Sequence, residues 1–521
     1  MKEKHKYGQY FTKAVVAEYM VSLISQPKDC RVLEPSCGEG VFLSKLAEGG
    51  YSNCRAYEID RELAKDFDNV QYESFLSVPV EEKYDVVIGN PPYIRWRNLE
   101  AELKEELLGN ALWNRYFNSL CDYLFIFILK SIEHLNEGGE LIFICSDYWM
   151  NSTHSATLRN YMVSQGYFEK IFHFKEAALF EGVNASFVIF KYRKNSCNRE
   201  AMIDLLTYTE KASPTLETLQ QESSFRHTRI PQFEQNERWL LATREMQDEL
   251  RWFESVCVKR SNLFGNELCR IREVCDIGNG MVSGLDAAFK INENQPLNDL
   301  EKKHSIPVLK AKNLGQYSYI APSQYIYMPQ GIGQAEFLSD YPHFASQLEP
   351  YKEALLKRYS YGRDLPYWEF AFPRSKTLFE RQEAKIFVPC KERISHKHYF
   401  RFCHAPAGFY PLQDVTAMVR KPGCRESVEY ILAFLNSKYV YDWLRFNGII
   451  KGEIVEFSET PIASIPFRRI DWDNESEVRI HDDITLSVKN YLAEGSPTVK
   501  EEINNALTKL FYGKYSLQET A

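Results

Sequence analysis

Short apolar runs alternate with helical patterns along the first half of the chain. The run at residues 84–89 has an unbroken Val-Val-Ile centre, which is typical of a strand buried on both faces of a parallel sheet. Helical patterns at 41–47 and 123–135 stand between such runs. The strands expected on this basis are residues 31–34, 54–59, 84–89, 140–145 and 186–190. Alternating strands and helices predict an open α/β sheet, whose ligands bind beyond the carboxyl ends of the strands.

The pattern weakens around residues 195–250, where polar stretches indicate connections. We therefore place a domain boundary near residue 245. The second half consists of short aromatic-rich segments broken by Gly and Pro, which favours a mixed α+β domain, and the polar end of the chain has a helical pattern. The predicted organisation is a catalytic domain at 1–245, a second domain at 246–470 and a helical segment at 471–521.

Composition excludes several classes of protein. The chain has 521 residues and a net charge of −8, and no apolar run approaches the roughly 18 residues of a membrane span. The first residues lack an apolar signal core. The 12 cysteines are scattered without a Cys-x-x-Cys pair, which argues against a zinc site and against a disulfide framework. We therefore expect a cytoplasmic protein that binds no metal.

One segment departs from the overall acidity. Residues 351–401 contain 12 Lys and Arg against 6 Asp and Glu, a local excess of +6 (12 − 6). A protein that binds nucleic acid needs a basic surface somewhere, whatever its net charge. On this signal alone, an ordinary solvated surface is an equally good interpretation.

A glycine-rich turn follows the first predicted strand, at residues 34–40. Gly38 and Gly40 allow a tight turn and close approach of the backbone to a ligand. The spacing fits neither G-x-G-x-x-G nor a Walker loop. Glu58 ends the second strand, where an acid is placed to accept hydrogen bonds from ribose hydroxyls. Phe75, near the end of a third strand, is suited to line an adenine pocket. The structural alternatives are a plain turn, a surface acid and a core aromatic.

The most specific motif is Asn90-Pro91-Pro92-Tyr93, which directly follows the strand at 84–89. The two prolines restrict the backbone and fix Asn90 and Tyr93 at the edge of the sheet. The Asn90 amide oxygen and the Pro91 carbonyl are two acceptors for one –NH2 group, and Tyr93 could stack on the ring that carries it. This arrangement suits in-line transfer of a methyl group from a sulfonium to nitrogen, driven by positioning. A simple turn is the alternative.

With these motifs in their order, the first 195 residues resemble the γ-class N6-adenine DNA methyltransferases of the TaqI type. The resemblance implies a Rossmann-like S-adenosylmethionine-dependent methyltransferase domain with Asn90, Pro91, Pro92 and Tyr93 as catalytic residues. Thr12, within a motif at 8–12, would help to hold the methionine carboxylate. The cofactor-binding residues implied by the resemblance are Thr12, Glu34, Pro35, Cys37, Gly38, Gly40, Glu58, Ile59 and Phe75.

Two further positions come from the same resemblance. The segment at 180–190 would supply a second aromatic ring against the target base, which we assign to Phe190, with Phe187 as the alternative. Family members often carry Asp directly before the aromatic at Phe75, where this chain has Ser74. Serine can form a hydrogen bond without charge, so we expect no strong contact to the cofactor there.

The second half resembles the target-recognition domain of the same family more loosely. Its glycine-rich opening lies at 276–284, and its closing helix and strand lie at 434–437 and 457–466. In such domains Lys and Arg contact phosphates while a few side chains read base edges. The residues expected to contact DNA are Arg363, Trp368, Arg374 and Lys385. A solvated charge is the alternative for each basic residue.

The resemblance implies a monomeric, site-specific DNA adenine methyltransferase that flips its target base out of double-stranded DNA. It would be the modification enzyme of a restriction-modification or phage-defence system, with a separate cognate restriction endonuclease as partner. An N-methyltransferase acting on a protein glutamine or on RNA is the alternative, because the same tetrapeptide occurs there, but the large second domain weighs against it. The intact motifs disfavour an inactive specificity subunit. The motifs begin at residue 8, which disfavours a fused N-terminal nuclease.

Overall fold

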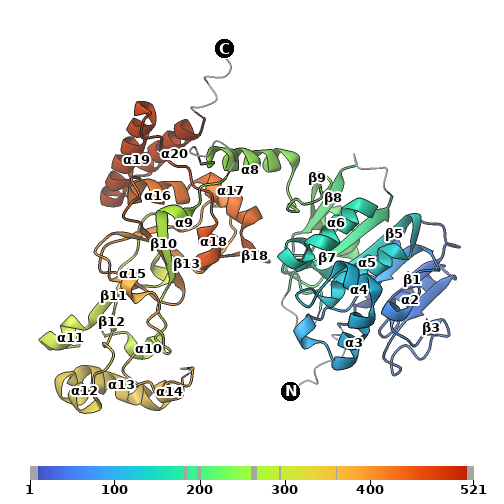
Figure 1. Cartoon of the computed structure of the whole chain (residues 1–521), viewed down its shortest axis with the longest axis horizontal. Helices are drawn as coiled ribbons and strands as arrows, with labels where there is room; N and C mark the ends of the chain where they lie inside the picture. Colours follow the sequence, from blue (N-terminus) through green and yellow to red (C-terminus); the bar gives the residue numbers. More distant parts are fainter. Residues whose placement is uncertain are drawn as a thin grey trace. The chain divides into compact units, whose positions relative to one another are not determined.

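The computed structural model describes residues 10–180, 185–195, 201–259, 267–292, 295–358 and 361–512. The chain divides into two compact units, Met1–Gln247 (unit 1) and Asp248–Ala521 (unit 2). Figure 1 shows the elements of both units along the chain.

Unit 1 is built on a nine-stranded sheet in the order β3-β2-β1-β4-β5-β7-β6-β8-β9. The strands are β1 (Val32–Glu34), β2 (Cys54–Tyr57), β3 (Val70–Gln71), β4 (Tyr84–Gly89), β5 (Leu135–Ser146), β6 (Gly166–His173), β7 (Phe187–Lys194), β8 (Ile203–Tyr208) and β9 (Phe225–Ile230). Strands β1 to β5 pair in parallel, whereas β7 runs antiparallel to both β5 and β6. The predicted α/β fold is confirmed, with a sheet that is parallel over its first five strands and mixed beyond them.

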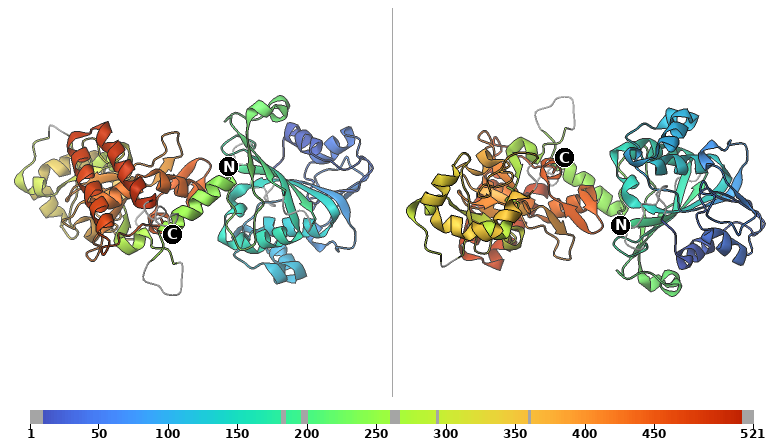
Figure 2. Two further views of the ribbon diagram at one scale, coloured as in Figure 1. Left: turned by 90° about the horizontal axis from the view of Figure 1, so that it is seen from above. Right: turned by 90° about the horizontal axis from the view of Figure 1, so that it is seen from below.

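Helices cover both faces of this sheet (Figure 2). Alternate side chains of β5 point to opposite faces, so Ile142 and Ile144 join one core while Leu141 and Phe143 join the other. The first core includes side chains of α1 (Ala14–Ser22), α2 (Val41–Glu48) and α7 (Leu216–Gln220). The second includes those of α3 (Ala101–Gly109), α4 (Ala111–Tyr116), α5 (Tyr123–Glu133) and α6 (Ala156–Gln165). The Asp122 side chain caps α5 by accepting from the Leu124 amide at 3.1 Å.

The structure differs from two of the expectations for this half. The helix expected to run to residue 135 ends at Glu133, and β5 begins at Leu135 and contains the Gly138-Gly139 pair. The polar region 195–250, interpreted as connections, contributes β8 and β9 to the sheet. Burial alternates along β8, and the edge strand β9 is buried mainly at its two ends, so neither forms the continuous apolar run that identifies a central strand.

The described part of unit 2 contains three small sheets, in the orders β10-β17-β13-β15, β12-β11-β16 and β14-β19-β18. Their strands are β10 (Cys275–Asn279), β11 (Ser305–Leu309), β12 (Ser323–Ile326), β13 (Lys385–Pro389), β14 (Lys391–Arg393), β15 (Cys403–Ala405), β16 (Tyr410–Pro411), β17 (Val415–Arg420), β18 (Ile449–Lys451) and β19 (Ile454–Glu456). A core of aromatic and aliphatic side chains joins the first two sheets.

Helices complete unit 2 and follow its sheets to the end of the described chain. They are α8 (Arg244–Val256), which begins in unit 1, α9 (Ile271–Val274), α10 (Asp286–Phe289), α11 (Asp299–Lys303), α12 (Gln334–Asp340), α13 (Pro342–Leu348), α14 (Lys352–Leu356), α15 (Lys376–Phe379), α16 (Val428–Leu435), α17 (Lys438–Asn447), α18 (Glu459–Ala463), α19 (Glu475–Glu494) and α20 (Pro497–Tyr512). Helices α19 and α20 pack on one another and on α16. They lie in the segment that the sequence predicts to be helical.

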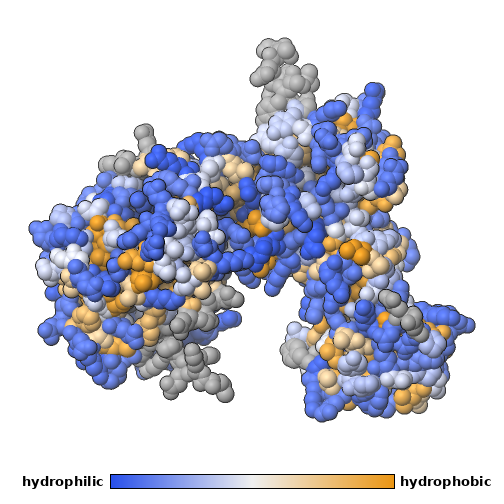
Figure 3. Space-filling view, turned by 180° about the vertical axis from the view of Figure 1, so that it is seen from behind, coloured by the Kyte–Doolittle hydropathy of each residue, from blue (hydrophilic) through white to orange (hydrophobic). Residues whose placement is uncertain are grey.

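The surface in view in Figure 3 is mostly polar, with apolar side chains gathered in patches. Within the described ranges, no helix is both long and apolar enough to cross a membrane.

Candidate active site

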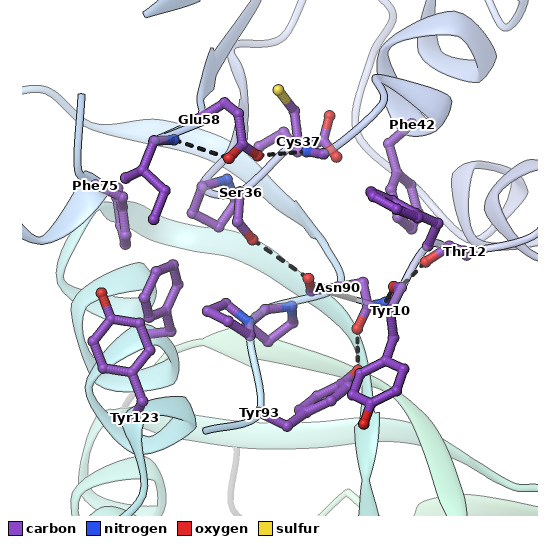
Figure 4. Close-up of a pocket in the computed structure, with 18 of the residues that line it drawn as sticks. Tyr10, Thr12, Ser36, Cys37, Phe42, Glu58, Phe75, Asn90, Tyr93 and Tyr123 are labelled. Carbon is purple, nitrogen blue, oxygen red and sulfur yellow. Dashed lines mark hydrogen bonds between the residues drawn. The ribbon is translucent and has the colours of Figure 1, made fainter. Parts of the chain in front are cut away.

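A pocket opens at the carboxyl ends of β1, β2, β3 and β4 (Figure 4). Its walls include most of the residues that the sequence assigns to the cofactor and to catalysis. Those that line it are Thr12, Glu34, Pro35, Cys37, Gly38, Glu58, Ile59, Phe75, Asn90, Pro91, Pro92 and Tyr93. Parallel strands end at one edge of a sheet, so segments far apart in the sequence meet in this pocket.

The glycine turn after β1 depends on left-handed backbone. Gly38 has φ +55° and Gly40 has φ +82°, a region that residues with a Cβ rarely adopt. A Cβ at Gly40 would lie 2.3 Å from the Phe67 ring, so a larger residue would also have to displace that ring. Gly40 precedes α2 as its N-cap and does not itself line the pocket. Gly40 therefore shapes the loop without contacting the pocket itself.

Glu58 ties the glycine turn to the end of β2. One carboxylate oxygen accepts from the Gly38 amide at 2.8 Å, and the other accepts from the Ile59 and Asp60 amides at 2.9 Å each. The side chain is buried, and burial raises its pKa even though these three donors oppose the shift. Glu58 is thus held rigidly at the pocket wall.

Glu34 is the most unusual group in the pocket. Its side chain is 1% exposed, and neither carboxylate oxygen has a hydrogen-bond partner among the described residues. Burial and the nearby negative charge of Glu58 raise its pKa well above the usual range. A buried carboxylate without partners is costly unless a ligand supplies donors or positive charge. The two Glu34 oxygens are therefore open to a ligand that carries such a group.

Asn90 is fixed from one side by the N-terminal segment. Its Nδ2 donates to the Tyr10 carbonyl at 2.7 Å and to Thr12 Oγ1 at 3.1 Å. These bonds direct the amide oxygen away from Tyr10, and that oxygen accepts from the Tyr93 hydroxyl. The Tyr93 hydroxyl also lies 2.9 Å from the Ile144 carbonyl oxygen. Because an amide oxygen has two lone pairs, Asn90 retains one for a ligand.

Aromatic rings gather around Tyr93. The Tyr10 ring lies 6.1 Å away with an interplanar angle of 28°, and the Phe187 ring lies 6.3 Å away. Phe180 contacts Phe187 at 4.7 Å and Tyr10 at 6.4 Å. Burial raises the pKa of the Tyr93 hydroxyl, which therefore stays protonated. Tyr93 is a half-buried ring at the pocket's aromatic end.

The assignment of Phe190 as the second stacking ring is wrong. Phe190 is 1% exposed and packs against Phe143, Trp149 and Phe168 in the core beneath the sheet. Positions 187 and 190 of one strand face opposite sides of the sheet, so only one of them can approach Tyr93. The alternative, Phe187, is the residue on the correct face.

The remaining predicted positions, around Phe75, line another wall of the same pocket. Phe75 packs among Tyr57, Phe127 and His134 with ring distances of 5.9, 5.6 and 5.2 Å. Ser74 also lines the pocket, and its hydroxyl accepts from the Leu76 amide at 3.2 Å. The same hydroxyl also forms a hydrogen bond with the Tyr123 side chain.

Sequence reasoning missed several lining residues. Tyr10, Phe42 and Phe127 are pocket-lining aromatics that were not assigned to the site. One signal pointed to Tyr10, which lies in the motif at 8–12. Gly8 and Gln9 of that motif lie outside the described residues.

The predicted DNA contacts in unit 2 divide into exposed and buried residues. Arg363 and Arg374 are exposed. Trp368 is 5% exposed and stacks on Phe337 at 4.6 Å. Lys385 is fully buried at the start of β13, and its ammonium donates to the Arg381 and Glu383 carbonyls. The assignment of Trp368 and Lys385 to a DNA-contacting surface is therefore wrong, because both belong to the interior of unit 2.

A pocket at the carboxyl ends of a sheet with this strand order is where S-adenosylmethionine-dependent methyltransferases bind their methyl donor, and this chain is one of them. A family model described as Eco57I restriction-modification methylase matches residues 42–180.

Whole-length relatives extend this result to the second half. The chain is 44% identical over 515 residues to the Type II methyltransferase M.HindII of Haemophilus influenzae, with 98% of each chain covered. It is 42% identical over 514 residues to the Type II methyltransferase M.HincII of the same species, again with 98% of each covered. The chain belongs to the Type II methyltransferases, the DNA methyltransferases of restriction-modification systems.

A solved structure shares the fold across both units. The Type IIL restriction-modification enzyme MmeI, solved in complex with DNA, matches 96% of this chain and 72% of its own, with a TM-score of 0.57 and 12% identity. This likeness concerns the fold alone.

Proposed function

We propose that the protein transfers a methyl group from S-adenosylmethionine to N6 of an adenine flipped out of a specific duplex sequence. The observation that carries this proposal is the Asn90 amide oxygen, which two bonds from Asn90 Nδ2 hold in place at the pocket wall. It would act as a γ-class enzyme of the TaqI type and as the modification partner of a separate restriction endonuclease.

The donor set of the pocket fits the methyl donor. The two unpartnered oxygens of Glu34 suit the ammonium group of the methionine part of S-adenosylmethionine. Thr12 accepts a hydrogen bond from Asn90, so the residue expected to hold the methionine carboxylate lies beside the expected catalytic residue. Glu58 suits the ribose hydroxyls, and Phe75 and Ile59 suit the flat adenine ring. When bound, S-adenosylmethionine supplies an electrophilic methyl group on a sulfonium.

Asn90 and Pro91 would orient the reacting nitrogen. The Asn90 oxygen and the Pro91 carbonyl accept its two N–H hydrogens, so the lone pair points at the methyl group. The same two oxygens stabilise the positive charge that grows on nitrogen during transfer. Tyr93, with Phe187 and Phe180 beside it, would stack on the adenine ring. Neither a metal nor a covalent intermediate is required by this scheme.

Unit 2 would dock on the duplex and read its sequence, with Arg363 and Arg374 among its phosphate contacts. One candidate active-site pocket and one recognition unit among the described residues suit a monomer.

The decisive experiment identifies the methylated nucleoside. The purified protein is incubated with tritiated S-adenosylmethionine and unmethylated genomic DNA, and the DNA is digested and chromatographed. We expect the label in N6-methyladenine. Label in a methylated cytosine would overturn the adenine assignment, and label found only in RNA or protein of a cell extract would favour the alternative substrates.

A further inference from the structure

A second cavity lies wholly within unit 2. It has a volume of about 460 Å³, which is in the range of small-molecule sites. Four segments that are distant in the sequence line it: Gln316, the loop at 397–399, the junction of α16 and α17 at 436–439, and α20 between residues 500 and 508. None of these segments takes part in the proposed methyl transfer.

The wall of this cavity is basic although the chain is acidic. Its described lining residues include Lys397, Lys438 and Lys500 and no Asp or Glu, whereas the whole chain has a net charge of −8. Lys438 is already paired with Asp442 at 2.7 Å. The ammonium groups of Lys397 and Lys500 have no carboxylate partner among the described residues, and that of Lys500 lies 5.0 Å from the centre of the Tyr399 ring. Two such cations suit an anionic ligand.

The start of α17 adds hydrogen-bond donors to the same wall. Ser437 caps this helix by accepting from the Val440 amide at 3.3 Å. The first amides of a helix, here those of Lys438 and Tyr439, have no acceptor within the helix itself. Ser437, Lys438 and Tyr439 all line the cavity. Backbone amides at a helix N-terminus and lysine ammonium groups are donors that bind phosphate.

A buried side chain of the wall carries an acceptor that has no partner. Asn436 is 3% exposed, and its Nδ2 donates to the Phe402 carbonyl at 2.8 Å and to the Leu432 carbonyl at 3.0 Å. These bonds fix the amide, because the reverse orientation would set an oxygen against two carbonyl oxygens. Asn436 Oδ1 and the buried Oε1 of Gln316 then lack a hydrogen-bond donor among the described residues. Unpaired buried acceptors are costly, so this wall suits a ligand that brings N–H or O–H groups.

We propose that this cavity binds a small phosphorylated molecule that carries free hydrogen-bond donors, as a nucleoside monophosphate does. Its phosphate lies between Lys397, Lys500 and the start of α17, and its hydroxyl or amino groups donate to Asn436 and Gln316. Duplex DNA is a poorer match, because its deoxyribose has no free hydroxyl within the strand and most of its base N–H groups are paired. The cavity is formed by unit 2 alone, so the inference needs no particular placement of the two units.

Calorimetric titration of the full-length protein with adenosine monophosphate tests this inference. Saturating S-adenosylhomocysteine is present throughout, so that the pocket of unit 1 is closed to the nucleotide. We expect adenosine monophosphate to bind at one site, and inorganic phosphate, which lacks the sugar and amino donors, to bind at least about tenfold more weakly. Gln316→Leu should weaken the binding of the nucleotide about threefold and leave that of inorganic phosphate unchanged.

Lysine variants locate the site. Lys500→Met should weaken nucleotide binding about tenfold, and it should melt no lower than wild type, because burial of the Lys500 ammonium already opposes its charge. Lys509→Met is the matched control, since it removes an exposed lysine of the same helix that does not line the cavity. This control should bind the nucleotide as wild type does.

Four results would overturn the inference. They are no binding of adenosine monophosphate, equal affinity for the nucleotide and inorganic phosphate, equal losses in Lys500→Met and Lys509→Met, and displacement of the nucleotide by duplex DNA. The last result would assign this wall to the DNA-binding surface. Methylation of a base other than adenine would contradict the proposed function and leave the nucleotide titration unaffected.

Discussion

The two units place their polar side chains in opposite environments. In unit 1 the groups of the pocket are buried, as Glu34 and Glu58 are, and follow directly from strand ends. In unit 2, Arg363 and Arg374 are exposed and surround a ring on a loop. A buried polar group has few partners and each matters greatly, whereas an exposed charge is screened by solvent. The comparison predicts few large effects in unit 1 and many small ones in unit 2.

The largest effect is expected at Asn90. Asn90→Ala removes an acceptor aimed at the reacting amine, and it should lower kcat by about a thousandfold or more. The measurement is single-turnover transfer of a tritiated methyl group to DNA. Near-normal turnover would show that another acceptor orients the amine.

Asn90 also bonds the N-terminal segment, so its removal needs a structural control. Thr12→Val deletes one partner of Asn90 Nδ2 while the Tyr10 carbonyl remains. We expect a much smaller fall in kcat for Thr12→Val than for Asn90→Ala. Equal losses would mean that the packing of the segment, rather than the amide oxygen, is responsible.

The next effect is expected at Glu34. Glu34→Gln keeps the shape of the side chain and removes its negative charge, so affinity for S-adenosylmethionine should fall about 10- to 100-fold. Calorimetric titration measures this directly. In wild type the affinity should rise with pH as the raised pKa of Glu34 is crossed, because only the ionised carboxylate attracts a cation. The variant should lack that rise.

The ligand-free protein should respond in the opposite direction. The folded-state pKa of Glu34 is raised above its unfolded value, so between the two values only the folded state holds the proton. Stability therefore falls as pH rises from the unfolded value through the folded one. Glu34→Gln removes this loss and should melt above wild type at neutral pH. A lower melting temperature would indicate that Glu34 has a partner in solution.

The units also differ in how far the sequence predicts them. The catalytic motif and the glycine turn are short contiguous segments after apolar strands, so strand ends and motif order were sufficient to place Glu34, Glu58 and Asn90. Alternate residues of a strand face opposite sides of the sheet, and the sequence alone did not show which side Phe190 faces. Phe190 was therefore misassigned.

In unit 2 the sequence predicted a mixed fold and a basic segment, without distinguishing exposed from buried charges. Lys385 carries the same charge as an exposed lysine, and only the β13 pairing shows that it is buried. Tyr361 and Phe372 are 11 positions apart (372 − 361), and their contact depends on a loop closed by tertiary bonds. No local pattern encodes such a contact.

A smaller effect, on stability, is expected at Gly284. Its φ is +89°, and an added Cβ would lie 2.6 Å from Cδ of Arg358, whose guanidinium donates to three backbone carbonyls. Gly284→Ala should reduce the free energy of unfolding by about 2 kcal/mol, through backbone strain and displacement of Arg358. Gly331 has φ +92° with open space around its Cβ position. Gly331→Ala therefore measures the strain alone, and thermal melting of the two variants isolates the packing part.

The smallest effect is expected at Arg374. If this exposed residue is one phosphate contact among several, as proposed, Arg374→Ala should weaken DNA binding only about two- to fivefold and reduce the salt-dependence slope by about 1. Lys385→Met is the matched control, because its ammonium is buried against two carbonyls. That variant should keep the wild-type slope while it loses stability. If both slopes fell equally, burial would not be what separates the two basic residues, and the contrast between the interior and the surface of unit 2 would fail.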